Sequence, residues 1–323
     1  MIPRNLSGLA VSVLCTIAVS AVAQSPSATA GTWEIEKLAF EVPTAAYSPR
    51  PDGGLATVTF GTVTASDILV IDSRHSRPHK LVTGAFPAWS PDGTQLAYCT
   101  REGIGFGQIQ IVDADGRNKK QLTKIKGGAC YPDWSPDGKR ILFTAFDSKN
   151  SDIFVMDRDG QNMARVTEGY AAHWSPDGNK LLFTRSPEKG DNQQSVWVAT
   201  VDGKDTRLAV RGVSLQDATW LPNGAGIVFS SFGGKNQTIF LSNLNGAQPR
   251  EIEDDNHYEW FEPMISPDGK YLVAVVKCIR DSCSSGSSLQ PFNSTSILLV
   301  EAGTHRQKVL AQGTHPSVSW SNK

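Results

Sequence analysis

The stretch YPDWSPDGKRILFT, residues 131–144, decides the fold, because its central phrase returns along the chain. Intact copies of WSPDG stand at Trp89–Gly93, Trp134–Gly138 and Trp174–Gly178. Weaker copies begin at Tyr47, Trp220 and Ile265, and a seventh fragment, Trp320-Ser321, lies near the end of the chain. Successive copies begin about 40 to 55 residues apart, the length of one four-stranded repeat. The chain is therefore predicted to be a repeat protein.

The interior of each unit repeats as well. In the third unit, two tight turns, Ser135–Gly138 and Asp157–Gly160, separate strands of apolar and β-branched residues. These predicted strands, from innermost to outermost, are Tyr131–Trp134, Arg140–Thr144, Asp152–Met156 and Ala164–Thr167. Counterparts of the second strand are Leu55–Phe60, Leu96–Thr100, Lys180–Thr184, Gly226–Ser230 and Tyr271–Val276. The sequence therefore predicts six four-stranded antiparallel units.

Such units predict an all-β fold, a six-bladed β-propeller. Continuous apolar runs such as Leu181–Phe183 fit strands buried on both faces between neighbouring blades. A tryptophan at the same place in successive blades is expected to fill the core between them. The fragment Ser317–Trp320 is expected to join the N-terminal unit and close the ring. Trp33–Leu38 alternates like a strand and is expected either to take part in that closure or to pack outside it.

Charge excludes one class of partner. The chain of 323 residues has 31 basic and 32 acidic side chains, and no cluster of Lys and Arg of the kind that displaces counterions from phosphates. Nucleic acid is therefore not expected as a partner. Separately, the protein is expected to be a monomer.

The N-terminus predicts export. A positive charge at Arg4, a mostly apolar stretch at Leu6–Val22 and the small residues of Ala21–Ala23 match a cleaved signal peptide. The alternative is that this segment is a membrane anchor, but its four hydroxyl side chains argue against that interpretation. The predicted layout is a signal peptide at 1–23, a linker and strand at 24–43 and the propeller at 44–323. The mature protein is expected in the periplasm or outside the cell, and not to span the membrane.

Cysteines are expected to pair in that compartment. Four remain after cleavage, Cys99, Cys130, Cys278 and Cys283, and they allow three pairings. The short polar stretch between Cys278 and Cys283 favours the pairing Cys278–Cys283 with Cys99–Cys130, and free buried thiols are the alternative. Their spacing does not match a zinc site, and no metal or cofactor is expected.

The repeat resembles that of TolB-type propellers. The resemblance rests on WSPDG, on a following strand such as Ile141–Thr144, on Ile153–Asp157 and on an Asp-x-Asp-Gly turn, and it covers roughly residues 44–320. It implies six blades, a periplasmic or secreted location, and binding of proteins or peptides of the cell envelope. About twenty residues separate the predicted cleavage point from the first repeat, so the α/β domain that precedes the TolB propeller is not expected here.

Variable loops on one face are the expected binding surface, since the tight turns occupy the other face. Glu251–Pro263 is the most unusual of these loops, because acidic and aromatic side chains mix there. Its candidate contact residues are Glu253, Asp254, Asp255, His257, Tyr258 and Trp260. A solvated loop whose aromatic residues plug the ring is the alternative.

Two further candidates, Asp133 and His173, stand in predicted innermost strands, and His257 and His315 lie in connections leading to later ones. No nucleophile elbow or metal-binding histidine motif accompanies them, so no catalytic residue is assigned. The sequence predicts a non-enzymatic binding propeller. A carbohydrate-active lyase or hydrolase with its site at the propeller axis is the alternative, because each blade of a propeller can contribute one residue.

Overall fold

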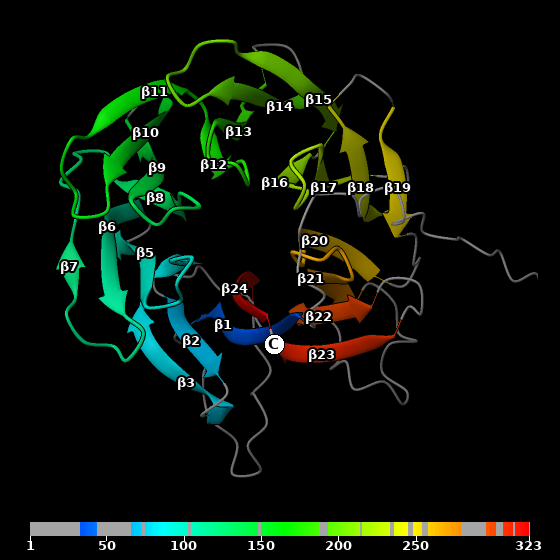
Figure 1. Ribbon diagram of the computed structural model, residues 1–323, viewed down its shortest axis with the longest axis horizontal. Coiled ribbons are helices and arrows are strands. Elements are labelled where there is room, and N and C mark those ends of the chain that lie inside the picture. Colours follow the sequence, from blue (N-terminus) through cyan, green and yellow to red (C-terminus); the bar gives the residue numbers. More distant parts are fainter. Residues whose placement is uncertain are drawn as a thin grey trace, which may run out of the picture.

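The computed structural model shows a closed ring of six four-stranded sheets (Figure 1). It describes residues 33–43, 66–72, 75–102, 105–147, 150–187, 193–213, 215–232, 236–244, 248–253, 258–278, 295–301, 306–312 and 314–322. Within these ranges every regular element is a strand and all sheet pairing is antiparallel. The predicted all-β, six-bladed propeller is confirmed.

Each blade begins at the ring centre and ends at the rim. Blade 1 contains β24 (Thr314–Asn322), β1 (Trp33–Pro43), β2 (Ser66–Asp72) and β3 (His75–Thr83). Blade 2 contains β4 (Ala85–Trp89), β5 (Gln95–Glu102), β6 (Gly105–Asp113) and β7 (Lys120–Gln121). Blade 3 contains β8 (Ala129–Trp134), β9 (Arg140–Phe146), β10 (Ser151–Asp157) and β11 (Ala164–Glu168).

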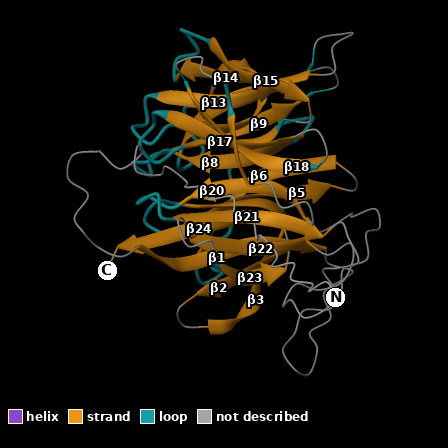
Figure 2. Ribbon diagram, turned by 90° about the vertical axis from the view of Figure 1, so that its right-hand side faces the viewer, coloured by secondary structure: helices purple, strands orange, loops and turns teal. Residues whose placement is uncertain are grey.

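The other three blades repeat this order. Blade 4 contains β12 (Tyr170–Trp174), β13 (Lys180–Arg185), β14 (Gln193–Thr200) and β15 (Arg207–Val213). Blade 5 contains β16 (Gln216–Trp220), β17 (Gly226–Phe232), β18 (Gln237–Asn243) and β19 (Arg250–Glu253). Blade 6 contains β20 (Tyr258–Ile265), β21 (Tyr271–Cys278), β22 (Thr295–Glu301) and β23 (Gln307–Gln312). In side view the strands run along the ring axis between two loop-bearing faces (Figure 2).

The two ends of the chain close the ring. β24 pairs with β1 along most of its length, from Trp33 opposite Asn322 to Glu41 opposite Thr314. The expected closure by Ser317–Trp320 is confirmed, and the alternative that Trp33–Leu38 packs outside the ring is excluded. A strand paired on both sides leaves no open sheet edge at the junction.

Three details of the first blade differ from the sequence expectation. β1 fills the second-strand position that was assigned to Leu55–Phe60, and β24 fills the innermost position assigned to the copy at Tyr47. The expected start of the propeller at residue 44 therefore falls inside the first blade. Residues 44–65 lie outside the described part of the chain. The weak copy at Tyr47 carries the turn residues of the motif, but turn residues do not show which segment pairs as the innermost strand, so the assignment from the sequence was wrong.

Six apolar clusters lie between neighbouring blades, one at each junction of the ring. The repeated tryptophans belong to these clusters and are almost fully buried, at 5% exposure for Trp134 and 8% for Trp220. Each of these two indoles also donates a hydrogen bond to the preceding blade, from Trp134 Nε1 to the Ala88 carbonyl (3.1 Å) and from Trp220 Nε1 to the His173 carbonyl (3.2 Å). The tryptophans hold one blade to the next, as expected.

The WSPDG turns are stabilised by the same contacts in successive blades. In blade 3 the Ser135 hydroxyl donates to Asp137 (2.6 Å) and accepts the Arg140 N–H (2.9 Å), while Asp137 accepts the Lys139 N–H (3.1 Å). These hydrogen bonds favour the carboxylate, so the pKa of Asp137 lies below its ordinary value. Gly138 follows at a φ of +67°, a conformation that side chains with a Cβ rarely adopt.

Candidate functional site

One residue in every innermost strand has a positive φ, although none of them is glycine. The φ values lie between +48° and +54° at Phe86, Tyr131, Ala171, Asp217, Glu262 and His315. Each coincides with a break in the pairing register, which is the mark of a β-bulge. Left-handed backbone at a residue other than glycine costs on the order of 1–2 kcal/mol. Six repeated costs of this kind identify the centre of the ring as a candidate site.

The six bulged residues surround a cavity of about 200 Å³ on the axis. Further lining comes from the next residues of the same strands, among them His173 of β12, Thr219 of β16 and Met264 of β20. Strands separated by more than 200 residues thus meet at one point, because the ring brings all innermost strands to its centre.

Blades 4 and 5 each contribute one ionisable side chain, His173 and Asp217, to one side of this axial pocket, and Asp133 of blade 3 lies beside His173. His173 Nδ1 lies 3.7 Å from Asp133 Oδ2. Burial disfavours the imidazolium of His173, but the hydrogen bond and charge of Asp133 outweigh it, so the pKa of His173 is raised. Burial also raises the pKa of Asp217, against the opposing effects of His315 and of its own hydrogen bonds. The two predicted residues Asp133 and His173 are therefore neighbours at the axis.

Blades 5, 6 and 1 continue the ionisable side. Asp217 Oδ2 accepts the Glu262 N–H (3.3 Å), and Glu262 in turn accepts the His315 N–H. Glu262 Oε1 also lies 3.4 Å from His315 Nε2. Each carboxylate therefore contacts the backbone of the next blade, as Asp133 does by accepting the Trp174 N–H (2.8 Å). These carboxylates thus also join the inner strands of neighbouring blades, so their removal would lower stability.

Aromatic rings form the other side of the axial pocket. The Phe86 ring lies with its centroid 4.2 Å from that of His315 and 4.2 Å from that of Tyr131. Phe106 and Phe146 extend this group away from the axis, with stacked rings 4.6 Å apart. The pocket thus has one acidic and one aromatic side.

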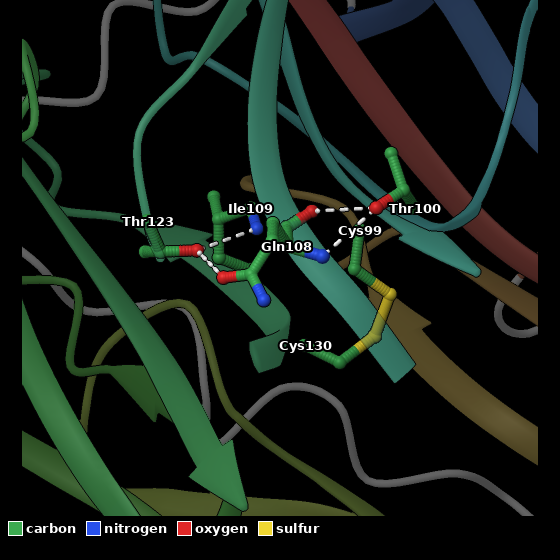
Figure 3. The surroundings of a disulfide bond; sticks show 6 residues. All are labelled: Cys99, Thr100, Gln108, Ile109, Thr123 and Cys130. Carbon is green, nitrogen blue, oxygen red and sulfur yellow. Dashed lines mark hydrogen bonds between the residues drawn. A yellow bond between two sulfur atoms is a disulfide. The ribbon is translucent and has the colours of Figure 1, made fainter. Parts of the chain in front are cut away.

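A disulfide fixes the strand that carries Tyr131. Cys99 of β5 and Cys130 of β8 are bonded, which joins blades 2 and 3 directly before Tyr131 (Figure 3). Beside it, Gln108 Oε1 accepts hydrogen bonds from the Thr123 hydroxyl and the Ile125 N–H, both 2.8 Å. The connection from β7 to β8 is thus attached to β6 by side-chain hydrogen bonds. Cys283 and the side chain of Cys278 lie outside the described part of the structure.

The acidic and aromatic segment expected as a binding loop is partly strand. Tyr258–Ile265 forms β20, and Glu253 is the last residue of β19. Asp254, Asp255 and His257 lie outside the described residues, as does the side chain of Glu253. Tyr258 is half-buried, and the Trp260 indole is 1% exposed within the core between blades 5 and 6. A buried indole cannot reach a partner, so Trp260 does not belong to the binding surface.

Sequence reasoning did not select Phe86, Tyr131, Asp217, Glu262 or His315 as a set. A signal existed, because the first five bulged residues stand three positions before Trp89, Trp134, Trp174, Trp220 and Ile265. The same spacing from His315 leads to Val318, so Val318 and not Trp320 corresponds to the repeated anchor. Aligning the units on their anchors and reading three residues upstream would have identified the ring.

No group of three or more His, Cys, Asp or Glu side chains suited to a metal ion occurs among the residues that the structure places. The Asp-x-Asp-Gly segments at Asp113 and Asp157 are the turns from β6 to β7 and from β10 to β11. A search of the same described ranges finds no helix of the length and hydropathy needed to cross a bilayer.

A family model described as the TolB beta propeller domain matches residues 79–281. This chain belongs to the TolB β-propeller family. The Tol-Pal system protein TolB of Francisella tularensis is 25% identical over 196 residues, which are 59% of this chain and 45% of that protein. The chain thus spans a little under half the length of this curated relative.

Solved structures agree on the fold. The crystal structure of TolB from Acinetobacter baumannii superposes with a TM-score of 0.64 at 20% identity and covers 88% of this chain and 66% of that one. An oligogalacturonate lyase from Vibrio parahaemolyticus superposes with a TM-score of 0.51 at 12% identity, over 76% of this chain and 71% of the lyase. One propeller architecture therefore serves both a Tol-Pal protein and an enzyme.

Proposed function

We propose that this chain is an exported, non-enzymatic binding propeller that engages a protein or peptide of the cell envelope through its axial pocket. Membership in the TolB propeller family supports an envelope partner, and the predicted signal peptide supports a periplasmic or secreted location. The observation that carries the proposal is the ring of six bulged residues, to which every blade contributes one.

The size of the axial pocket favours a protein partner. Its volume of about 200 Å³ is below the roughly 300–1,000 Å³ of pockets that enclose a small-molecule ligand. A pocket of this size accepts one side chain that a partner inserts while its remaining surface rests on the surrounding loops. Anchoring by a single side chain in a central pocket is common in protein interfaces.

The charge of the pocket favours a basic side chain. Asp217 and Glu262 line the pocket together with His173 and His315, Asp133 lies beside His173, and the Phe86 and Tyr131 rings stand on the other side. A lysine or arginine inserted there gains both carboxylate contacts and cation–π contact with an aromatic ring. We therefore expect the partner to present an exposed basic side chain at the centre of its contact surface.

The experiment is capture of envelope proteins by the purified chain, identified by mass spectrometry. The test variant, Asp217→Asn with Glu262→Gln, keeps an oxygen that can accept the two backbone N–H groups but removes the negative charges. The control, Asp115→Asn, removes one charge from an exposed turn on the opposite face. A specific partner should be captured by the wild type and the control, and about tenfold less by the test variant. Equal capture by all three proteins would refute the axial site.

A second function, a carbohydrate-active lyase or hydrolase, is favoured by one observation. Two histidines, His173 and His315, each stand beside a carboxylate, and such pairs can exchange protons with a substrate. The purified protein is incubated with acidic polysaccharide, and product is measured as new reducing ends. Product formation that His173→Gln abolishes would favour the enzyme, and its absence with wild type would favour the binding protein.

A further inference from the structure

A second and larger cavity lies off the axis, between blades 3 and 4. Its volume is about 830 Å³, and its lining comes from the ends of β9, β11 and β13 and from the starts of β10, β12 and β14, together with Tyr131 of β8 and Arg211 of β15. These strand ends belong to the face opposite the WSPDG turns. Tyr131 lines both cavities, so the inter-blade cleft, as we call this larger cavity, adjoins the axial pocket.

Blade 4 presents a row of two arginines to the cleft. Ser195 of β14 pairs with Arg185 of β13 on one side and with Arg211 of β15 on the other. Residues directly opposite one another in antiparallel strands point to the same face of the sheet. All three residues line the cleft, so two guanidinium groups flank one serine there. Such a pair favours an anionic group between them, since a carboxylate can accept hydrogen bonds from both.

Neighbouring contacts hold Arg185 in this row. Its guanidinium lies 4.6 Å above the Trp197 ring, and it donates to the Glu168 carbonyl (3.3 Å) and to the Thr167 hydroxyl (3.2 Å). Trp197 Nε1 donates to Ser195 Oγ (2.9 Å), which ties the serine to the same ring. A side chain fixed in this way loses little entropy when it binds.

Blade 3 presents acidic groups to the same cleft. Asp147 directly follows β9 and Glu168 ends β11, and both line the cavity. The cleft thus has a basic wall on blade 4 and an acidic wall on blade 3, joined by the aromatic side chains of Tyr131, Phe146 and Tyr170. The amide side chains of Asn150 and Gln193 add donors and acceptors that match a peptide backbone.

We propose that the inter-blade cleft is a second binding site, which takes an extended peptide segment carrying an acidic and a basic group. The acidic group lies on the Arg185–Ser195–Arg211 row and the basic group faces Asp147 and Glu168. A peptide fits this arrangement better than an acidic saccharide, which has an anion but no cation for the blade 3 wall. The volume lies within the range of pockets that enclose a ligand, unlike that of the axial pocket.

The test uses fluorescent pentapeptides on one neutral Tyr-Ser-Gly frame, with fluorescence anisotropy against the full chain. The five peptides carry one Glu, one Lys, both, neither, or a free C-terminal carboxylate without Glu. The first four are acetylated and amidated, so the fifth separates a terminal carboxylate from a side-chain carboxylate. The peptide with both charges should bind most tightly, about tenfold tighter than the neutral one.

Arg211→Gln tests the arginine row, because Arg211 is exposed and its replacement leaves the core intact. The matched control is Arg207→Gln on the same strand, whose guanidinium donates to the Leu244 carbonyl of blade 5. Arg211→Gln should weaken the peptides that carry a carboxylate about tenfold and leave the Lys peptide unchanged, and Arg211→Lys should restore part of the loss. Arg207→Gln should change nothing.

Three results would overturn this assignment: no saturable binding of any peptide, equal weakening by both Gln variants, or competition by glucuronic acid at lower concentrations than by the doubly charged peptide. The axial variant Asp217→Asn with Glu262→Gln should bind the peptides like the wild type. The cleft and the axial pocket can therefore fail independently of each other.

Discussion

Replacement of Trp134 by alanine tests the claim that the repeated tryptophans hold the ring together. Trp134 is 5% exposed, packs between blades 2 and 3, and donates to the Ala88 carbonyl of the preceding blade (3.1 Å). Loss of a buried tryptophan ring lowers the free energy of unfolding by about 3–5 kcal/mol. Trp134→Phe keeps most of the ring but leaves the Ala88 carbonyl without its donor, at a cost of about 1–3 kcal/mol.

Urea unfolding followed by far-UV circular dichroism measures both variants, since that signal does not depend on the removed indole. The midpoint should fall for Trp134→Phe and fall further for Trp134→Ala. Leu208→Ala, at a side chain that is 44% exposed, is the control and should change stability by less than about 0.5 kcal/mol. If Trp134→Ala unfolded at the wild-type midpoint, the tryptophans would not be structural, and a role in ligand binding would have to be reconsidered.

Three further predictions concern the disulfide, the axial histidine and the turns. The double variant Cys99→Ser with Cys130→Ser should have a free energy of unfolding about 3.7 kcal/mol below that of the oxidised wild type, from the loop-entropy relation for a separation of 31 residues. Urea unfolding of the variant and of the reduced and oxidised wild type measures this difference, and equal stability of the reduced and oxidised protein would contradict it. The raised pKa of His173 means that its contribution to stability is complete below its unfolded pKa of about 6.5 and is lost as pH rises through the higher folded value. Melting temperatures across pH 5 to 9 should show this loss in the wild type and a flatter profile in His173→Gln, and identical profiles would argue against it. Gly138→Ala should lower the free energy of unfolding by about 1–2 kcal/mol because of the φ of +67° at this position, since an added Cβ would meet only Pro91, at an ordinary distance of 3.8 Å. The control Lys139→Ala, in the same turn, should unfold at nearly the wild-type urea midpoint.

The candidate site could be predicted only in part. Asp133 and His173 were selected because they stand in predicted innermost strands, and they lie 3.7 Å apart, with His173 lining the axial pocket. Trp260 was selected because acidic residues surround it in the sequence, but burial between blades 5 and 6 removes it from the surface. Composition of a segment does not tell which of its side chains face the core, because that depends on the neighbouring blade.

The sequence alone determined that this protein is a ring of six similar sheets. Repeated turns and apolar runs about 45 residues apart are local features, so blades 2 to 6 could be recognised without knowledge of the others, whereas the strands of blade 1 could not. Only the tertiary structure decided which N-terminal strand pairs with the C-terminal one and which side chains meet at the centre of the ring. β1 and β24 pair across almost the whole length of the chain, and the bulged residues, from Phe86 in blade 2 to His315 in blade 1, meet at the axis of the ring that this pairing closes. The spacing of three residues before each anchor marks the bulged positions, but which of these side chains contact one another follows from the closed geometry of the ring.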